Sequence, residues 1–277
     1  MRGARPLLQA DLAMGLSHAP RRGTRTPDSE APTPPRTMPE RSPPPEPPPS
    51  SSQAPTQVAN AASRAIQTPA LRSEPVVRGA EALDALRARH DRECPHCTTA
   101  TTHTQTVFGE GSATAELMFI GEAPGETEDR LGRPFVGRAG EKLDEMIRAM
   151  GLQREAVYIA NVLKSRPPDN RTPLQHEVDA CGPYLIEQIL TIRPRVIVTL
   201  GGPATKLLLG TEEGITRLRG SWSEWRPPAG GDPIPVMPTY HPAYLLRNYT
   251  AKVRGEVWQD LQAVMQALGL RRTGGSD

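Results

Sequence analysis

The stretch between residues 116 and 138 limits the fold of this chain more than any other. Residues 117–120 form a short apolar run between turn residues, which is typical of a buried strand. A glycine-rich turn that carries Glu122 follows, and apolar residues then recur at helical spacing from Gly137 onward. Such a strand–turn–helix unit places polar side chains at the carboxyl edge of a sheet, where open α/β folds bind ligands. One turn of this kind also fits an ordinary connection, so its meaning depends on the rest of the chain.

The alternation of strand and helix continues along the chain. Three further apolar runs predict strands at residues 157–163, 196–200 and 234–239. Helical patterns flank them, from about residue 80, over 172–189 behind a Thr-Pro cap, after 201–202 and over 251–268. Residues 211–233 are expected to be irregular. Strands that alternate with helices predict an α/β fold whose mostly parallel sheet is covered on both faces.

The first 75 residues have a composition that argues against a folded core. Proline accounts for 31 of the 277 residues, and residues 1–75 are rich in proline, serine, alanine and arginine. Such a segment cannot bury enough apolar surface to offset its ordering entropy. We therefore expect a disordered tail over residues 1–75, a folded domain over 76–270 and a disordered end over 271–277. Proline-rich tracts also dock to aromatic grooves, so a partner that binds this tail remains open.

Charge and cysteine usage narrow the setting in which the protein works. A net charge of +2 permits a nucleic-acid partner without requiring one. No apolar run is long enough to span a membrane, and the N-terminus lacks the apolar core of a secretory signal. Three cysteines, including Cys94 and Cys97 in a Cys-Pro-His-Cys sequence, do not form a secreted disulfide framework. They favour a metal or redox role in a reduced, cytoplasmic setting without membrane contact.

Four motifs that occur in collinear order between about residues 90 and 268 carry a family resemblance: GEAPGETED, GRPFVG, YIANVLKSRPPDNR and PTYHPAYLLRN. They resemble the motifs of the family 4 uracil-DNA glycosylases, the iron–sulfur branch of that superfamily. Agreement among several separate motifs is stronger evidence than any single match. The resemblance implies a three-layer α/β/α sandwich with a four-stranded parallel sheet, preceded by the proline-rich tail. It also implies a DNA repair enzyme that flips uracil out of DNA and hydrolyses its N-glycosidic bond, leaving an abasic site.

The residue types in these motifs indicate how a pyrimidine would be held. Phe135 offers a flat apolar face on which a base can stack. The amide of Asn161 can donate to uracil O4 and accept from N3–H, whereas cytosine presents the opposite pattern. The resemblance places Glu128 near uracil C5, where a thymine methyl group would clash, and makes Gly121 a further substrate-binding position.

Three residues are expected to carry the chemistry. His241 would stabilise the transition state, because a positioned imidazole N–H near uracil O2 meets the negative charge that develops as the bond breaks. Asn170 matches the family position that orients the attacking water. Glu122 matches a pocket position and is expected near that water. The resemblance therefore assigns catalytic roles to His241, Asn170 and Glu122.

DNA contact has its own candidates. Leu245 is expected to project from a loop after His241 and to wedge into the gap left by the flipped base. Loop cations at the same sheet edge are expected to bind phosphate, namely Arg166, Arg219 and Arg247, together with Lys164, Arg171 and Arg217. The expected partner is uracil-containing DNA, single- or double-stranded, bound by a monomer.

The family holds a [4Fe–4S] cluster on four cysteines, and this chain departs from that set. Cys94, Cys97 and Cys181 match three of the positions, whereas Ser165 stands at the fourth. Three outcomes remain open: a cluster with a Ser165 alkoxide ligand, a cluster on three cysteines, or zinc that takes His96 as a ligand. We expect a bound but labile cluster with a mainly structural role, because none of the pocket residues is a ligand.

Three functions are compatible with these residues. The first is an active uracil-DNA glycosylase, which the intact pocket motifs favour. The second is a DNA-binding relative with weakened or lost catalysis, tethered to a partner through the tail. The third is a zinc-stabilised hydrolase that acts on another nucleotide substrate. The sequence leaves open the strand preference and activity on other damaged bases.

Overall fold

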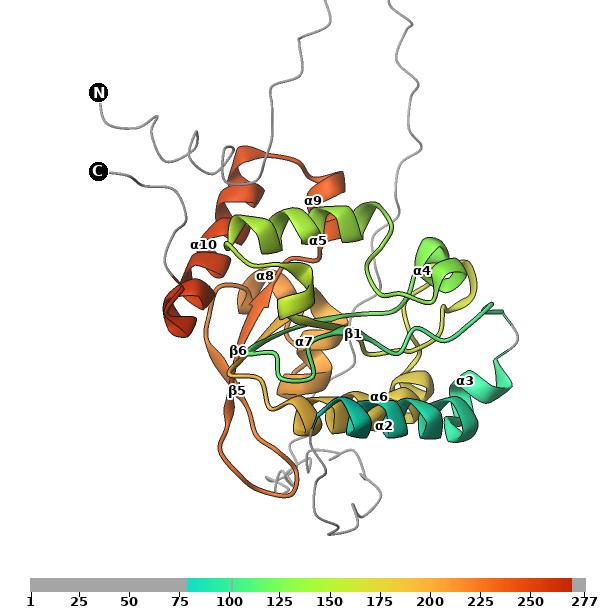
Figure 1. The fold of residues 1–277 in the computed structure, drawn as a ribbon. Helices are drawn as coiled ribbons and strands as arrows, with labels where there is room; N and C mark the ends of the chain where they lie inside the picture. Colours follow the sequence, from blue (N-terminus) through green and yellow to red (C-terminus); the bar gives the residue numbers. More distant parts are fainter. Residues whose placement is uncertain (1–78, 101, 271–277) are drawn as a thin grey trace, which may run out of the picture. The chain divides into compact units, whose positions relative to one another are not determined.

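The computed structural model describes residues 79–100 and 102–270, all of which belong to one compact unit. The disordered segments expected over 1–75 and 271–277 lie outside the described residues. The described part is a three-layer sandwich with helices on both faces of a central sheet (Figure 1). The α/β/α architecture predicted from the alternating pattern is confirmed.

The central sheet has six strands in the order β1-β3-β2-β4-β6-β5. The four inner strands are parallel and lie where the apolar runs predict them: β2 (Leu117–Gly121), β3 (Tyr158–Asn161), β4 (Val196–Leu200) and β6 (Ile234–Thr239). The expectation of four strands was wrong for the whole sheet, because two short antiparallel strands extend its edges: β1 (Glu110–Gly111) and β5 (Ser223–Trp225).

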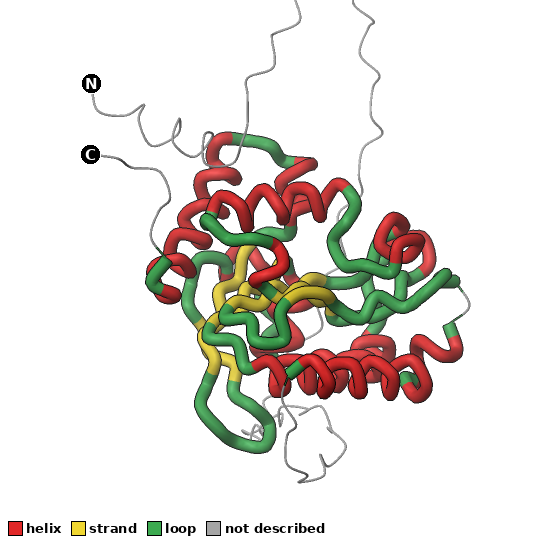
Figure 2. Tube along the Cα trace, in the orientation of Figure 1, coloured by secondary structure: helices red, strands yellow, loops and turns green. Residues whose placement is uncertain are grey.

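Two groups of helices cover the sheet (Figures 1 and 2). Three pack on one face: α5 (Arg138–Ala149), α9 (Pro242–Arg247) and α10 (Ala251–Leu268). Three pack on the other: α2 (Ala80–Glu93), α6 (Gln175–Ile192) and α7 (Gly202–Leu209). The remaining helical turns are short: α3 (Pro95–Thr99), α4 (Glu126–Leu131), η1 (Arg154–Ala156), η2 (Pro168–Asn170) and α8 (Ile215–Leu218). Among the described residues, no helix is long and apolar enough to cross a membrane.

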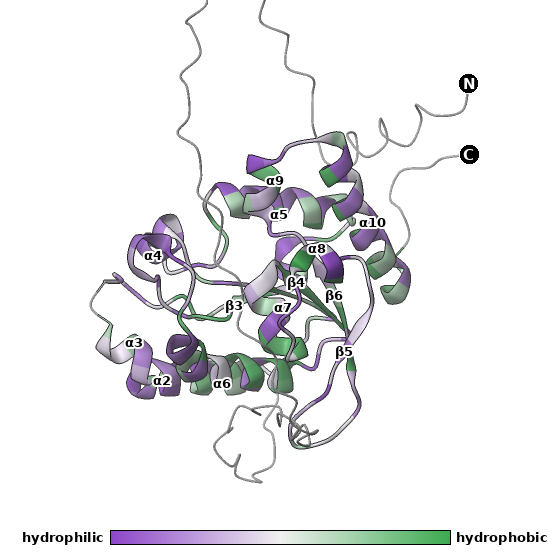
Figure 3. Ribbon diagram, turned by 180° about the vertical axis from the view of Figure 1, so that it is seen from behind, coloured by the Kyte–Doolittle hydropathy of each residue, from purple (hydrophilic) through white to green (hydrophobic). Residues whose placement is uncertain are grey.

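The strands are apolar along their whole length because both faces are covered. In β2, Leu117 and Phe119 pack towards α5 and α10, whereas Met118 and Ile120 pack towards α6 and α7. Side chains of a strand point alternately to opposite faces, so a strand between two helical layers must be apolar at every position. Figure 3 shows hydrophobic colour on the inner strands and on parts of the helices that cover them, such as α6 and α7.

Three segments differ from the sequence prediction. Helix α6 begins at Gln175, with Leu174 as its N-cap, rather than at Pro173 behind a Thr172 N-cap, because Glu177 accepts a hydrogen bond from the Leu174 N–H at 2.8 Å and so caps the first turn. The segment after His241, expected as a loop, is helix α9. The irregular region expected over 211–233 contains both α8 and β5.

The strand order brings the functional motifs to one edge. Residues Gly121 and Asn161 are paired at the carboxyl ends of the neighbouring strands β2 and β3. His241 follows β6, on the other side of β4. In an open parallel sheet, the chain leaves β2 towards β3 and later returns to β4, which creates a crevice at the carboxyl ends of the strands.

Candidate active site

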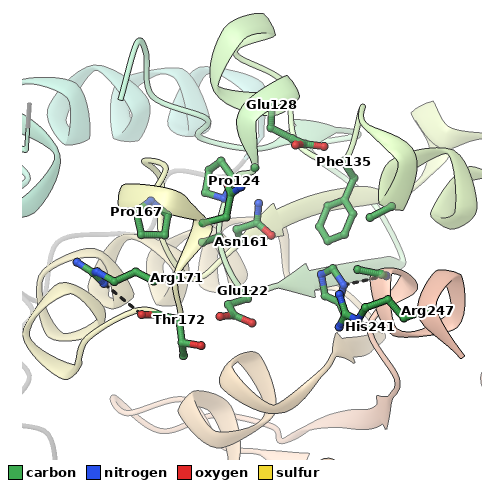
Figure 4. A pocket seen from close by; sticks show the side chains of 15 residues that line it. Glu122, Pro124, Glu128, Phe135, Asn161, Pro167, Arg171, Thr172, His241 and Arg247 are labelled. Carbon is green, nitrogen blue, oxygen red and sulfur yellow. Dashed lines mark hydrogen bonds between the residues drawn. The ribbon is translucent and has the colours of Figure 1, made fainter. Parts of the chain in front are cut away.

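A cavity of about 390 Å³ opens at this edge (Figure 4). Most of the predicted site residues line it: Glu122, Glu128, Phe135, Asn161, Asn170, His241 and Arg247. Gly121 lies directly behind Asn161 and Phe135. The structure therefore brings together all the expected catalytic and base-binding residues, which come from segments more than 100 residues apart.

Phe135 lies in the loop between α4 and α5 with a backbone φ of 50°. A bulky residue rarely adopts this left-handed conformation, so neighbouring contacts must hold it there. Arg154 donates hydrogen bonds to the carbonyl groups of Pro134 and Phe135 and pairs with Asp144 at 2.7 Å. The start of α5 lies so close that a Cβ atom on Gly140 would stand 2.0 Å from the Phe135 carbonyl. This support presents the aromatic ring to the cavity.

Asn161 ends β3 with only 1% of its surface exposed. Its Oδ1 atom is buried without a hydrogen-bond partner among the described residues. An orphaned buried acceptor costs about 1–3 kcal/mol, and native proteins rarely retain one without a reason. An acceptor of this kind in a cavity wall fits a ligand that donates a hydrogen bond.

Gly121 is required at its position by the two side chains in front of it. A Cβ atom there would stand 2.4 Å from both Asn161 Oδ1 and the Cζ atom of Phe135. We expect Gly121→Ala to lower the free energy of unfolding by about 1–3 kcal/mol, the usual cost of overpacking. Thermal unfolding measures this, with Gly255→Ala as the control. A Cβ on Gly255, inside α10, meets nothing within 4 Å, so that change should stabilise the helix. An unchanged melting temperature in Gly121→Ala would contradict the close packing.

His241 is the N-cap of α9, and its Nδ1 atom accepts a hydrogen bond from the Ala243 N–H at 3.1 Å. This bond leaves Nε2 as the protonated nitrogen of the neutral ring. Burial, reinforced by the charge of Arg247, lowers the pKa of His241 to about 4. The ring centroids of His241 and Phe135 are 5.5 Å apart, so the two rings share one wall of the cavity. His241 is therefore a neutral N–H donor near neutral pH.

The two carboxylates of the cavity have different surroundings. The Oε1 atom of Glu128 accepts hydrogen bonds from the N–H groups of Val136 at 2.9 Å and Gly137 at 2.8 Å. Glu128 thus caps α5 and anchors the loop of Phe135 while it also lines the cavity. Burial raises the pKa of Glu122, as expected for a carboxylate in a partly dry pocket.

Because burial raises the pKa of Glu122, the stability of the folded protein should depend on pH. The folded state holds this proton more tightly than the unfolded chain, so the free energy of unfolding falls as the pH rises through the two pKa values. At neutral pH the Glu122 carboxylate is ionised in the folded and the unfolded chain, so the full destabilisation from its burial is present there. Glu122→Gln should therefore raise the melting temperature at pH 7, and the gain should shrink at pH 4. The exposed Glu155→Gln change is the control and should have little effect. A lower melting temperature for Glu122→Gln at pH 7 would contradict this account.

Asn170 lies in the loop after β3, and its backbone φ is 53°. Its Oδ1 atom accepts a hydrogen bond from Arg166 Nε at 2.8 Å. Arg166 in turn approaches Glu126 at 3.8 Å. Arg166 therefore orients the Asn170 amide at the cavity rim, a contact that the sequence analysis did not predict.

Two of the expected DNA-contact residues, Leu245 and Arg219, do not lie where the sequence analysis placed them. Leu245 does not project from a loop: it lies on the inward face of α9 and is fully buried in the core. Arg219 is turned inward, where it pairs with the buried Asp260 and donates to the Glu256 carbonyl at 2.7 Å. A buried carboxylate requires such a partner, which removes this guanidinium from the DNA-facing set. Arg247, by contrast, is exposed and lines the cavity.

The three other loop cations, Lys164, Arg171 and Arg217, also differ in their burial and in their partners. Lys164 is fully buried and donates to the Asn161 carbonyl at 2.8 Å and to Gln188 Oε1 at 2.6 Å, so the prediction that it binds phosphate is wrong. Arg171 lines the cavity but pairs with Glu177 through two hydrogen bonds of 2.7 and 2.8 Å. Arg217 is exposed on α8.

The three cysteines form one buried cluster on the α2–α6 side. Cys181 Sγ lies 3.5 Å from Cys94 Sγ and 3.4 Å from Cys97 Sγ. Ser165 Oγ lies 3.3 Å from Cys97 Sγ. A fourth side chain that could bind a metal joins the cysteines, and it is His90; His96, named above only for a zinc site, is not in this group. Three thiols and an imidazole are donors typical of a metal centre, so this cluster can hold one.

Some functional residues escaped the sequence analysis. His90 precedes Cys94 by one helical turn, a spacing that could have drawn attention to it. Arg154 supports Phe135 from 19 residues away, and no local pattern marks it. Further cavity residues have no chemical signature of their own: Pro124, Ala139, Pro167, Thr172 and Ala243.

Comparison with known proteins agrees with this geometry. Residues 108–262 match the model of the uracil DNA glycosylase superfamily. The chain is 44% identical over 183 residues to the type-4 uracil-DNA glycosylase of Thermotoga maritima, which spans 66% of this chain and 93% of that protein. It is 44% identical over 182 residues to the type-4 uracil-DNA glycosylase of Saccharolobus solfataricus, a match that covers 64% of this chain and 82% of that protein. It is 41% identical over 199 residues to the type-4 uracil-DNA glycosylase of Archaeoglobus fulgidus, a match that covers 69% of this chain and 96% of that protein. The chain therefore belongs to the uracil-DNA glycosylase superfamily.

Proposed function

We propose that this protein is a DNA repair glycosylase that removes uracil from DNA and leaves an abasic site. The proposal rests on the Oδ1 atom of Asn161, which is buried without a hydrogen-bond partner in the described part of the chain and lies in a cavity walled by Phe135 and His241. A base can reach such a cavity only after it has left the stack. The type-4 uracil-DNA glycosylases similar to this chain support the same substrate.

The base is held by shape and by one amide. Asn161 Oδ1 accepts from uracil N3–H while its amide N–H donates to O4, and Phe135 stacks on the ring. Cytosine presents an acceptor at N3 and a donor at C4, so a fixed amide rejects it. Glu128, whose carboxylate is anchored to the backbone beside Phe135, lies near C5 and excludes the methyl group of thymine.

The chemistry needs a donor and a positioned water. As the C1′–N1 bond breaks, its electron pair moves into the uracil ring, and the Nε2–H group of His241 stabilises the charge on O2. Asn170 orients the water whose oxygen forms the new bond to C1′, and Glu122 accepts a hydrogen bond from that water. The water loses one proton and the uracil anion gains one, so the products are uracil and an abasic sugar.

The substrate DNA, single- or double-stranded, meets the protein at the cavity rim. Arg247 is exposed there and binds phosphate, and Arg166 contributes charge next to Asn170. The proposed catalytic unit is a monomer, as the sequence analysis expected. Reduced thiols in the buried cluster fit a cytoplasmic enzyme.

The cysteine cluster holds a metal centre in this proposal, and the family resemblance implies an iron–sulfur cluster. Cys94 and Cys97 would bind it from the junction of α2 and α3, and Cys181 would bind it from α6. Such a centre supplies structural cross-links at soft thiolate ligands. It would tie α2 and α6 to Ser165, which begins the loop that ends at Asn170. It takes no part in the hydrolysis.

A gel assay with an oligonucleotide that contains one uracil tests the function. The purified full-length chain should leave a site that alkali cleaves, in single- or double-stranded DNA. The same oligonucleotide with thymine or cytosine at that position should stay intact. Absence of cleavage on both forms of the uracil substrate would reject the enzyme and leave a DNA-binding relative.

A further inference from the structure

We propose that His90, and not Ser165, is the fourth protein ligand of the metal centre, which makes the ligand set three cysteines and one histidine. This inference rests on the metal centre of the proposed function, but not on uracil excision. It departs from the four-cysteine set of the family and concerns a residue outside the motifs that carry the resemblance.

His90 lies where a fourth metal ligand would stand, beside the three cysteines. The side chain is fully buried, and one of its ring nitrogens lies within 4.8 Å of the sulfurs of Cys94, Cys97 and Cys181. Its Nε2 atom is buried and has no hydrogen-bond partner among the described residues. This buried imidazole nitrogen thus stands beside three sulfurs without a well-formed hydrogen bond among the described residues, and it is free to bind a metal there.

The other ring nitrogen, Nδ1, determines whether Nε2 of His90 carries a proton or a lone pair. His90 Nδ1 lies 2.9 Å from Asp91 Oδ1, and an ionised carboxylate only accepts, so Nδ1 carries the proton. A histidine that binds a metal is neutral, and with the proton on Nδ1 its lone pair is on Nε2. Asp91 is itself held, because the Thr106 hydroxyl donates to the same Oδ1 atom at 2.9 Å. A carboxylate that orients a histidine in this way is the usual second layer of a protein metal site.

Packing fixes the ring in this orientation. Tyr184 of α6 meets the His90 ring edge-on, with the centroids 4.9 Å apart and the planes at 88°. Phe108 approaches from another side at 5.6 Å. His90 stands one helical turn before Cys94, so the backbone of α2 places both donors on the same side of the helix. The imidazole is therefore prepared for a ligand before any metal binds.

Ser165 has a different chemistry at the same cluster. Its hydroxyl would have to lose a proton of very high pKa to bind a metal well, whereas a neutral imidazole loses none. Its Oγ atom lies 3.3 Å from Cys97 Sγ, at hydrogen-bonding distance. Once Cys97 is a metal-bound thiolate, which only accepts, the Ser165 hydroxyl donates to it. Ser165 then hydrogen-bonds to the ligand Cys97 and is not itself a ligand.

Metal retention in four full-length proteins tests this assignment. The wild type, Ser165→Ala, His90→Ala and the double variant His90→Ala/Ser165→Cys are purified without oxygen. Iron, sulfide and zinc are measured per chain before and after a chelator. Ser165→Ala should lose metal only somewhat faster than the wild type, because it removes a hydrogen bond to Cys97 but no ligand, and His90→Ala at least about tenfold faster than the wild type. The double variant restores a four-thiolate set and should recover retention.

X-ray absorption at the edge of the bound metal provides a direct reading. The wild type should show the multiple scattering of one imidazole, and His90→Ala should not. Asp91→Asn leaves all donors in place but weakens the orientation of His90, so its metal loss should be intermediate. This variant keeps the assignment testable if His90→Ala does not fold.

Three results would overturn the assignment: wild-type protein without metal, a Ser165→Ala protein that loses metal while His90→Ala keeps it, or a spectrum without imidazole scattering. Uracil excision is measured on the same samples. A wild type that shows imidazole scattering but does not excise uracil would reject the proposed function and leave the ligand assignment intact.

Discussion

His241→Ala is expected to lower the rate of uracil excision by about 10²–10³-fold, the usual effect of removing one donor from an oxyanion site. The reason is that Ala243 occupies Nδ1, so Nε2–H is the donor that remains for the charge on O2. Single-turnover excision from a uracil-containing oligonucleotide measures the chemical step. His176→Ala, which changes an exposed histidine of α6, should leave the rate unchanged. A wild-type rate in His241→Ala would remove the residue from the mechanism.

The pH dependence of the same reaction checks the charge state of His241. Its lowered pKa means that the folded protein keeps the ring neutral until the pH falls to about 4. Protonation of His241 therefore should not change the rate between pH 8 and pH 5. Below this range the ring gains a proton at Nδ1, and the hydrogen bond from Ala243 is lost. A rate that rises as the ring becomes charged would contradict a neutral donor.

Asn161→Ala is expected to lower excision by about 10²–10⁴-fold, because two hydrogen bonds to the base are lost and the polar edge of uracil is left unpaired. Thermal stability should change little, since Asn161 Oδ1 has no hydrogen-bond partner within the described protein. The two readouts separate a substrate contact from a structural role. Asn248→Ala is the control: its amide donates to the Tyr244 carbonyl outside the cavity wall, and excision should persist. Loss of stability that accounts for the loss of activity would contradict the assignment.

The fold was largely predictable because its inner strands are buried on both faces. Such strands appear as continuous apolar runs, and β2, β4 and β6 lie where these runs are. The edge strands escaped because β1 has two residues and β5 has three, too few to show a period. Helix α9 had a signal that was missed, since His241 followed by Pro242 is an N-cap with proline at the first helical position.

The cavity residues were predictable from motifs, whereas their supports were not. Glu122, Asn161 and His241 stand next to strand ends, so the parallel topology alone gathers them. The pairing of Arg219 with Asp260, 41 residues away, follows only from the packed structure. Leu245 was misplaced for the same reason: its burial depends on which face of α9 meets the core.

The central claim is that this cavity breaks the bond between uracil and its sugar with water and leaves the DNA backbone whole. Mass analysis of a reaction in ¹⁸O-labelled water, on an oligonucleotide with one uracil, tests it most directly. We expect free uracil without the label and a full-length strand with one labelled oxygen at the abasic sugar. Release of a uracil nucleotide, or a strand cut without alkali, would contradict it and favour a hydrolase that acts on another bond.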